Sequence, residues 1–370
     1  MSSNLRVNSI TPSSGNNVAI GTAGGTISLV TNVSGISTFA TVRATSIVGV
    51  STVGVTTAYV GSINDGPISG ARNRIINGDM RIDQRNNGAS VNTNDAFPVD
   101  RFQMNFSGGG IITGQRSGIV PVGFTSSLSL TASTADTSIA AGDFYNLQQK
   151  IEGFNVADLG FGAASASSIT LSFWVRSSVT GTYGGALNNS AANRSYVFTY
   201  SISASNTWEY KTITILGDTS GTWLNNNGIG FRLLFDLGSG TTFNGTANTW
   251  NASNVFRTSG CVNWIANSAA TFYITGVQLE AGTVATPFER RSFGQELALC
   301  YRYFQRVDWI TTTLGSSGDY QNVGSLLVMM RTTPTLTSTN GTYTPVGSNG
   351  FRQTNNVTFG GTVITASIEL

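Results

Sequence analysis

Histidine is absent from this 370-residue chain, and its absence limits the chemistry that the side chains can perform. Ser-His-Asp and Cys-His catalysis and histidine-containing metal sites are excluded, and the usual general base near neutral pH is missing. Carboxylates remain, and Asp143, Asp218 and Asp236 could pair as the acid and nucleophile of a glycoside hydrolase. Their sequence neighbours give no sign of a raised pKa, so we expect no catalysis.

Three tryptophans are the best candidates for an exposed binding surface. Trp223 and Trp250 lie in loop-like segments rich in Gly, Asn and Thr, and Trp174 projects from the polar face of a predicted strand. Exposed aromatic faces can stack on the C–H surfaces of sugars, while polar side chains bind the hydroxyls. The alternative is that these rings belong to the core or to subunit contacts.

The elements that would position these residues are short strands. Residues 169–175, 196–202 and 231–237 alternate apolar and polar side chains, and Gly- and Asn-rich clusters separate them. Alternation with period two is the signal of a half-buried strand. With no clear helix in between, the pattern predicts an antiparallel β-sandwich, a jelly roll, over residues 71–290.

A pair of short motifs frames this central region. Asn73–Met80 opens it, and Gly276–Gly282 followed by Thr286–Glu289 closes it. Each half combines a strand-like run with a glycine turn. We therefore expect the two motifs to form the first and last strands of one domain, lying side by side.

The composition is typical of turn-rich β-structure. Charged residues make up only 10% of the chain, whereas it has 44 glycines, 20 phenylalanines and 6 tryptophans. This composition differs from that of a disordered chain, because disordered chains are rich in charged residues and poor in aromatic residues. So few charges also suit homo-oligomeric packing better than an isolated monomer. With lysine only at Lys150 and Lys211 and no basic run, we expect no nucleic-acid binding through a phosphate-neutralising patch.

Membrane insertion and export are not indicated either. No stretch is long and apolar enough to span a bilayer. The first residues carry no apolar signal-peptide core, so we expect synthesis in a cytoplasm.

Residues 1–70 form a distinct N-terminal arm. Small and β-branched residues dominate it in short alternating runs, and the pattern of Gly35–Thr38 recurs at Gly49–Thr52 and Gly54–Thr57. One copy cannot bury a core, whereas three intertwined copies would bury the Val and Ile side chains along a shared axis. We expect a trimeric shaft of short strands; the alternative is a flexible linker.

A connecting helix is predicted at residues 291–306. Ser292 and Gln295 have capping-box spacing, and an apolar stripe runs from Phe293 to Phe304, which predicts a helix over about 293–305. Cys261 and Cys300 give no disulfide framework; we expect two buried thiols, with a single bridge as the alternative.

A small C-terminal β-domain is expected over residues 307–370. The apolar run Ser325–Pro334 and the segments around Val357 and Val363 predict strands. The loops 315–318 and 347–350 could present a contact surface, or they could be ordinary turns.

The motifs resemble those of phage tail fibre proteins, especially of cyanophage type. The shared stretches are NRIINGDMRIDQRN, GVQLEAGTVATPFERR and ELALCYRYF, and the resemblance runs from about Leu5 to about Thr337. It implies a virion protein attached through its N-terminal arm to other phage tail or capsid proteins. It also implies a C-terminal tip at the receptor end of a homotrimer, and a glycan of the host surface as the ligand.

The central region also resembles carbohydrate-binding jelly rolls, some of which hold a structural calcium ion near such a strand pair. That resemblance implies Asp79 and Glu280 as two oxygen ligands of the six or more that calcium needs. The alternative is that Asp79 caps a turn and Glu280 pairs with an arginine. No other cofactor is expected.

The sequence therefore predicts a non-enzymatic phage tail fibre. A capsid decoration or tail-adaptor protein with the same jelly roll is the first alternative. A glycan depolymerase is the second, although the long regular repeats of tailspike β-helices are not visible.

Overall fold

The computed structural model describes residues 72–311, 323–353 and 360–370. By its internal contacts the chain divides into Met1–Tyr59 and Val60–Leu370, and the described residues all belong to the second unit. The shaft expected over residues 1–70, the loop 315–318 and the strand expected at Val357 lie outside the described residues.

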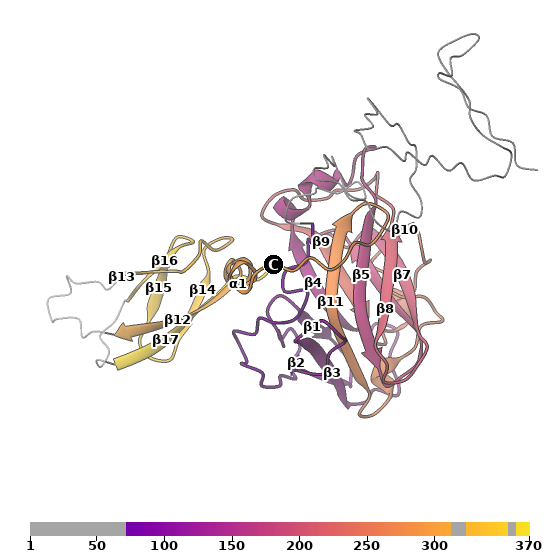
Figure 1. Cartoon of the computed structure of the whole chain (residues 1–370), viewed down its shortest axis with the longest axis horizontal. Coiled ribbons are helices and arrows are strands. Elements are labelled where there is room, and N and C mark those ends of the chain that lie inside the picture. The colour runs from indigo at the N-terminus through magenta and orange to yellow at the C-terminus, as the bar shows by residue number, and fades with distance from the viewer. Residues whose placement is uncertain (1–71, 312–322, 354–359) are drawn as a thin grey trace, which may run out of the picture. The chain divides into compact units, whose positions relative to one another are not determined.

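Two antiparallel sheets pack face to face as a β-sandwich (Figure 1). The six-stranded sheet has the order β1 (Gln103–Phe106), β4 (Tyr145–Glu152), β9 (Ile229–Asp236), β6 (Gly181–Asn188), β7 (Ser195–Ile202) and β10 (Trp250–Asn251). The five-stranded sheet has the order β2 (Ile111–Ser117), β3 (Ser127–Thr134), β11 (Thr271–Ala281), β5 (Ile169–Ser177) and β8 (Glu209–Ile215). Four single-turn 3-10 helices interrupt the loops at Gly153–Asn155, Ala157–Leu159, Thr241–Phe243 and Trp264–Ala266. This arrangement confirms the predicted all-β fold.

The core lies between the two sheets and follows the predicted alternation. On β5, the side chains of Ile169, Leu171, Phe173 and Val175 are fully buried. The Phe173 ring meets Phe235 of the opposite sheet edge-on, with ring centroids 5.1 Å apart. Because successive side chains point to opposite faces, Trp174 is left on the outward face of the five-stranded sheet.

The framing motifs do lie side by side, but the first of them is not a strand. Asn73–Met80 has an irregular backbone and hydrogen-bonds to β11: Arg74 N donates to Leu279 O at 2.8 Å and Val277 N to Gly78 O at 2.9 Å. The prediction of a first strand was wrong, because the Asn73 side chain makes one of the hydrogen bonds that a strand backbone would otherwise make with β11. Asn73 Oδ1 accepts from the backbone N–H of Leu279 at 3.0 Å.

The connecting helix is shorter than predicted. α1 spans Phe293–Tyr301, and its capping box between Ser292 and Gln295 is present. The predicted end near Gln305 was wrong, because the chain turns at residues 302–303 and Phe304 begins strand β12 (Phe304–Thr311), which pairs with β17 (Gly360–Ser367). Cys261 and Cys300 are both buried and free, as expected.

The C-terminal region, residues 304–370, contains two small antiparallel sheets. One has the order β12, β17, β14 (Thr335–Ser338), and the other β13 (Val323–Ser325), β16 (Gly350–Gln353), β15 (Tyr343–Val346). Residues 347–349 form the turn between β15 and β16. No described helix has the length and apolar character needed to cross a membrane.

The apolar run Ser325–Pro334 is not the predicted strand. Beyond β13 it is irregular, and it packs Leu326 and Met330 into a core cluster of its own region. The Gln305 side chain accepts the backbone N–H of Leu327 at 2.7 Å, a bond that a strand neighbour would otherwise make.

Candidate functional site

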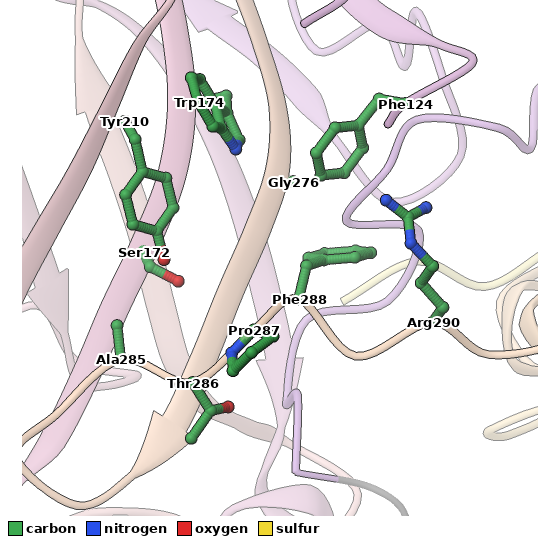
Figure 2. Close-up of a pocket in the computed structure, with 10 residues that line it drawn as sticks. All are labelled: Phe124, Ser172, Trp174, Tyr210, Gly276, Ala285, Thr286, Pro287, Phe288 and Arg290. Atoms are coloured by element: carbon green, nitrogen blue, oxygen red, sulfur yellow. The ribbon is translucent and has the colours of Figure 1, made fainter. Parts of the chain in front are cut away.

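An open cleft with aromatic walls lies on the outward face of the five-stranded sheet (Figure 2). Its volume is about 480 Å³, and we call it the aromatic cleft. The residues used below are part of its lining: Phe124, Ser172, Trp174, Tyr210, Gly276, Phe288 and Arg290. The sheet supplies one wall, and the loop between β2 and β3 together with the segment that follows β11 supplies the other.

Strand register places the first pair of rings. Trp174 on β5 lies directly opposite Tyr210 on β8, and their ring centroids are 5.3 Å apart at an interplanar angle of 44°. Such directly opposed residues have Cβ atoms close enough for their side chains to interact. Tyr210 is 44% exposed, so one side of this pair faces solvent.

A bulge in β11 shapes the floor of the cleft. The register of β11 against β5 shifts between Thr275 and Gln278, and Gly276 within the bulge has φ of 62°. A Cβ at Gly276 would lie 2.7 Å from the Phe124 ring, so a side chain there would displace that ring. Glycine is needed on both counts.

The second wall is a stacked group of side chains. The Phe124 and Phe288 rings meet edge-on at 5.3 Å, and the Arg290 guanidinium lies 4.8 Å from the Phe124 centroid. Arg290 also donates to the carbonyl of Gly123 at 2.5 Å. These contacts fix Phe288 between the sheet face and Arg290, as Figure 2 shows.

Polar atoms with no protein partner complete the cleft. Among the described residues, no hydrogen bond engages the indole Nε1 of Trp174, the hydroxyl of Tyr210 or the hydroxyl of Ser172. In Figure 2 the indole nitrogen points toward the middle of the cleft. The cleft therefore offers apolar ring faces together with free donors and acceptors.

A scan against protein-family models and a search of curated proteins found no match. Among solved structures, the enzymatically active domain of bacteriophage CBA120 tailspike protein 4 is similar at a TM-score of 0.30 and 12% identity; the match covers 57% of this chain and 21% of that chain. A family 11 carbohydrate-binding module from Clostridium thermocellum is similar at a TM-score of 0.28 and 12% identity, covering 53% and 98%. The C-terminal family 22 module of Clostridium thermocellum Xyn10B gives 0.29 and 12%, covering 53% and 95%. Similarities at this level assign neither a family nor a function.

Of the three predicted tryptophans, only Trp174 lines the aromatic cleft. Trp223 and Trp250 are half-buried against the core, with their ring centroids 5.4 Å apart. Both indole nitrogens donate to backbone carbonyls, of Ser220 at 3.1 Å and of Leu216 at 3.0 Å. Trp250 is in strand β10 rather than in a loop, because it pairs with Tyr196 of β7. These two rings therefore pack against the core and not in the aromatic cleft.

Each of the three candidate carboxylates has partners within the protein. Asp218 is held by both nitrogens of the Arg194 fork at 2.6 and 2.7 Å, and Asp143 accepts from the backbone of Ala140 at 2.9 Å. Asp236 departs from the expectation of an ordinary pKa. Burial raises the pKa of Asp236 to about 6, although Arg257 opposes the shift. Its contacts are with the turn at Ser239, inside the protein.

The two residues implied as calcium ligands have protein partners. Asp79 pairs with Arg81 at 2.5 Å, and Glu280 accepts from the backbone and the hydroxyl of Thr286 at 2.8 and 2.6 Å. No group of three or more Cys, Asp or Glu side chains within the described ranges could hold a metal ion. Calcium here stays a prediction that these contacts do not support, since calcium needs six or more oxygens.

Several residues of the cleft were missed at the level of sequence. Phe288 belongs to the closing motif and was taken only as part of the frame, and Arg290 directly follows that motif. Tyr210 carried a usable signal, because it lies two residues after Trp208 at the start of β8, and period two places both rings on one face. Phe124 carried none, since only the fold brings its loop to the bulge of β11.

Proposed function

We propose that this chain is a non-catalytic phage virion protein, a tail fibre, whose sandwich binds a glycan of the host surface in the aromatic cleft. The observation that carries this proposal is the pairing of Trp174 and Tyr210 beside unpaired polar atoms in an open cleft. Aromatic faces with a few convergent polar groups are the usual composition of such a site.

The contacts of a sugar follow from this geometry. A pyranose ring presents C–H groups on its face and hydroxyls at its edge, so the face packs on Tyr210 or Phe288. The Trp174 N–H donates to a hydroxyl, and the Ser172 and Tyr210 hydroxyls donate or accept. One such cleft binds weakly. Three clefts on one trimeric fibre would raise the avidity without new contacts.

Binding without catalysis is supported by what lines the aromatic cleft. Its described lining residues include no aspartate or glutamate. Hydrolysis of a glycosidic bond uses two carboxyl groups on either side of the scissile bond. A sugar held between Tyr210 and Phe288 would meet neither.

The virion part of the proposal has its support in the sequence. The framing motifs and the helix motif resemble those of phage tail fibres. The arm of residues 1–70 has the composition expected of an intertwined shaft and would join the fibre to other virion proteins.

A glycan array tests the binding. We expect the labelled full-length chain to bind a subset of bacterial surface polysaccharides, and Trp174→Ala to abolish that binding. Trp208→Ala is the matched control, because Trp208 directly precedes β8, the strand of Tyr210, and packs on Tyr273 outside the cleft. Binding of uncharged polysaccharides that survives Trp174→Ala, or an array with no bound polysaccharide, would contradict the proposal.

A further inference from the structure

A second cleft lies on the outward face of the other, six-stranded sheet. Its volume is about 280 Å³, and we call it the polar cleft. Along β4, Asn146, Gln148 and Lys150 alternate with Tyr145, Leu147 and Ile151, which face the core. The uncovered face of β4 therefore carries a row of polar side chains into the cleft.

Two cations oppose each other in this cleft. Lys150 on β4 and Arg232 on β9 are direct register partners, and both are partly buried. Like charges directly opposite on neighbouring strands are destabilising. Burial lowers the pKa of Arg232, and burial together with the Arg232 charge lowers the pKa of Lys150. The pair of Lys150 and Arg232 therefore does not stabilise the folded protein.

The charge of Arg232 is unmatched among the described residues. It has neither an ion pair nor a hydrogen bond there, and its Nε is buried without a partner. Lys150 donates to the backbone oxygen of Leu370, the final residue of the sequence, at 2.7 Å. Other arginines of this unit do form ion pairs: Arg194 pairs with Asp218 and Arg302 with Glu152, each at 2.6 Å.

The nearby acidic groups do not fill this gap. Glu369 is bound by Arg85 and Arg101. Asp95, at the exposed edge of the cleft, is held by Asn105 at 2.7 Å and forms no ion pair within the described residues. Arg232 in the cleft therefore keeps a positive charge that no described acidic side chain pairs.

Two further features indicate that the missing partner is a ligand. Asn146, only 2% exposed, has a buried Oδ1 with no hydrogen-bond donor although it lines an open cleft. Buried polar atoms in proteins are almost always paired, so an unpaired acceptor on a side chain that lines a cleft suits a ligand hydroxyl. The Phe243 and Phe256 rings, stacked at 4.6 Å, form an apolar wall beside it.

We propose that the polar cleft is a second binding site, on the sheet opposite the aromatic cleft, which takes an anionic group such as the carboxylate, sulfate or phosphate of an acidic sugar. Lys150 and Arg232 bind the anion, and the Asn146 amide binds a neighbouring hydroxyl. The hydrophobic wall packs on the body of the ligand. This site does not depend on the aromatic cleft.

Calorimetric titration of the full chain tests the site with four probes: an oligosaccharide of glucuronic acid, the same oligosaccharide with its carboxyls reduced, inorganic phosphate and sulfate. We expect the acidic oligosaccharide to bind and the reduced one to bind about tenfold more weakly or not at all. Added salt should weaken the binding. Phosphate or sulfate binding as tightly as the acidic oligosaccharide would identify a free anion as the ligand of the same site.

Variants assign the residues. Lys150→Gln and Arg232→Gln should each lower the affinity about tenfold or more. Lys211→Gln, which removes the other lysine of the chain from the opposite sheet, should not. Arg232→Gln should leave the melting temperature unchanged or raise it, because it removes a repulsion, whereas a structural role would lower it.

The outcomes separate this site from the aromatic cleft. Trp174→Ala should retain the binding of the anionic probe. Equal affinity for the acidic and reduced oligosaccharides, binding unaffected by both glutamine variants, or no binding of any of the four probes would overturn the proposal.

Discussion

The Arg302 guanidinium clasps the buried carboxylate of Glu152, with Nε at 2.7 Å and Nη2 at 2.6 Å from the two oxygens. Tyr303 donates to the same carboxylate at 2.8 Å. Arg302 directly follows α1, and Glu152 ends β4, so this pair ties the sandwich to the chain that leaves it. A fork of two charge-assisted hydrogen bonds is strong and directional.

We predict that Arg302→Met destabilises the protein by about 2 kcal/mol, because Glu152 keeps its charge while losing its main partner. Denaturant unfolding measures the change. Arg306→Met is the matched control, since Arg306 is exposed, and it should shift stability by less than about 0.5 kcal/mol. Equal losses in both variants would mean that the Glu152 contact contributes nothing specific.

The glycine of the opening motif has a packing reason. A Cβ at Gly78 would lie 2.2 Å from the carbonyl oxygen of Val277, a backbone atom of β11. We predict that Gly78→Ala costs about 3 kcal/mol through this clash. Gly118→Ala should be nearly neutral, because a Cβ there meets no atom within 4 Å. Thermal unfolding of both variants checks the prediction, and a stable Gly78→Ala would show that the motifs do not pack as described.

The raised pKa of Asp236 should make the stability of the folded protein depend on pH. Its pKa is about 6 in the folded protein, against 3.8 for an ordinary aspartate, because burial disfavours the charged form. Between those values the folded state binds more protons than the unfolded state, so this residue lowers stability as pH rises from about 3.8 to about 6.

We therefore predict that the free energy of unfolding of Asp236→Asn, relative to that of the parent chain, rises by about 3 kcal/mol as pH increases from 3.5 to 7. Urea unfolding of both chains at several pH values gives this difference. Because the test follows how this difference in stability changes with pH, any pH-independent effect of the substitution on the Arg257 contact cancels. A difference that does not change with pH would contradict the raised pKa.

Features that depend on the local alternation of apolar and polar side chains could be predicted from the sequence. The β5 faces were legible because each inward residue from Ile169 to Val175 is apolar. The backbone of Asn73–Met80 was not legible, because an asparagine side chain takes the place of a strand neighbour. The polar cleft was missed for a different reason. Lys150 and Arg232 are 82 positions apart, and only the register of β4 with β9 makes them neighbours.

The aromatic residues divide in the same way. Trp174 could be placed on an outward face from the alternation along its own strand. Trp223 and Trp250 looked exposed because polar residues flank them, yet Phe161 brings both rings together, with centroids 5.0 and 5.9 Å from its own. Neighbours in sequence do not reveal such a contact.

The proposed homotrimer has a definite expected mass in solution. Light scattering on the full-length chain should give about three times 38.8 kDa, because the N-terminal arm cannot bury its Val and Ile side chains alone. Removing residues 1–70 should yield a smaller assembly. A monomeric full-length chain would make the arm a linker and favour a decoration protein over a fibre.

Titration of Trp174→Ala with the polysaccharide that binds best on the array tests the central claim most directly. A lost indole face and N–H should lower the affinity about tenfold or more, while Trp208→Ala leaves it within about twofold. Both variants should unfold at the temperature of the parent chain, since neither ring belongs to the buried core. Unchanged affinity in Trp174→Ala would place glycan binding outside the aromatic cleft.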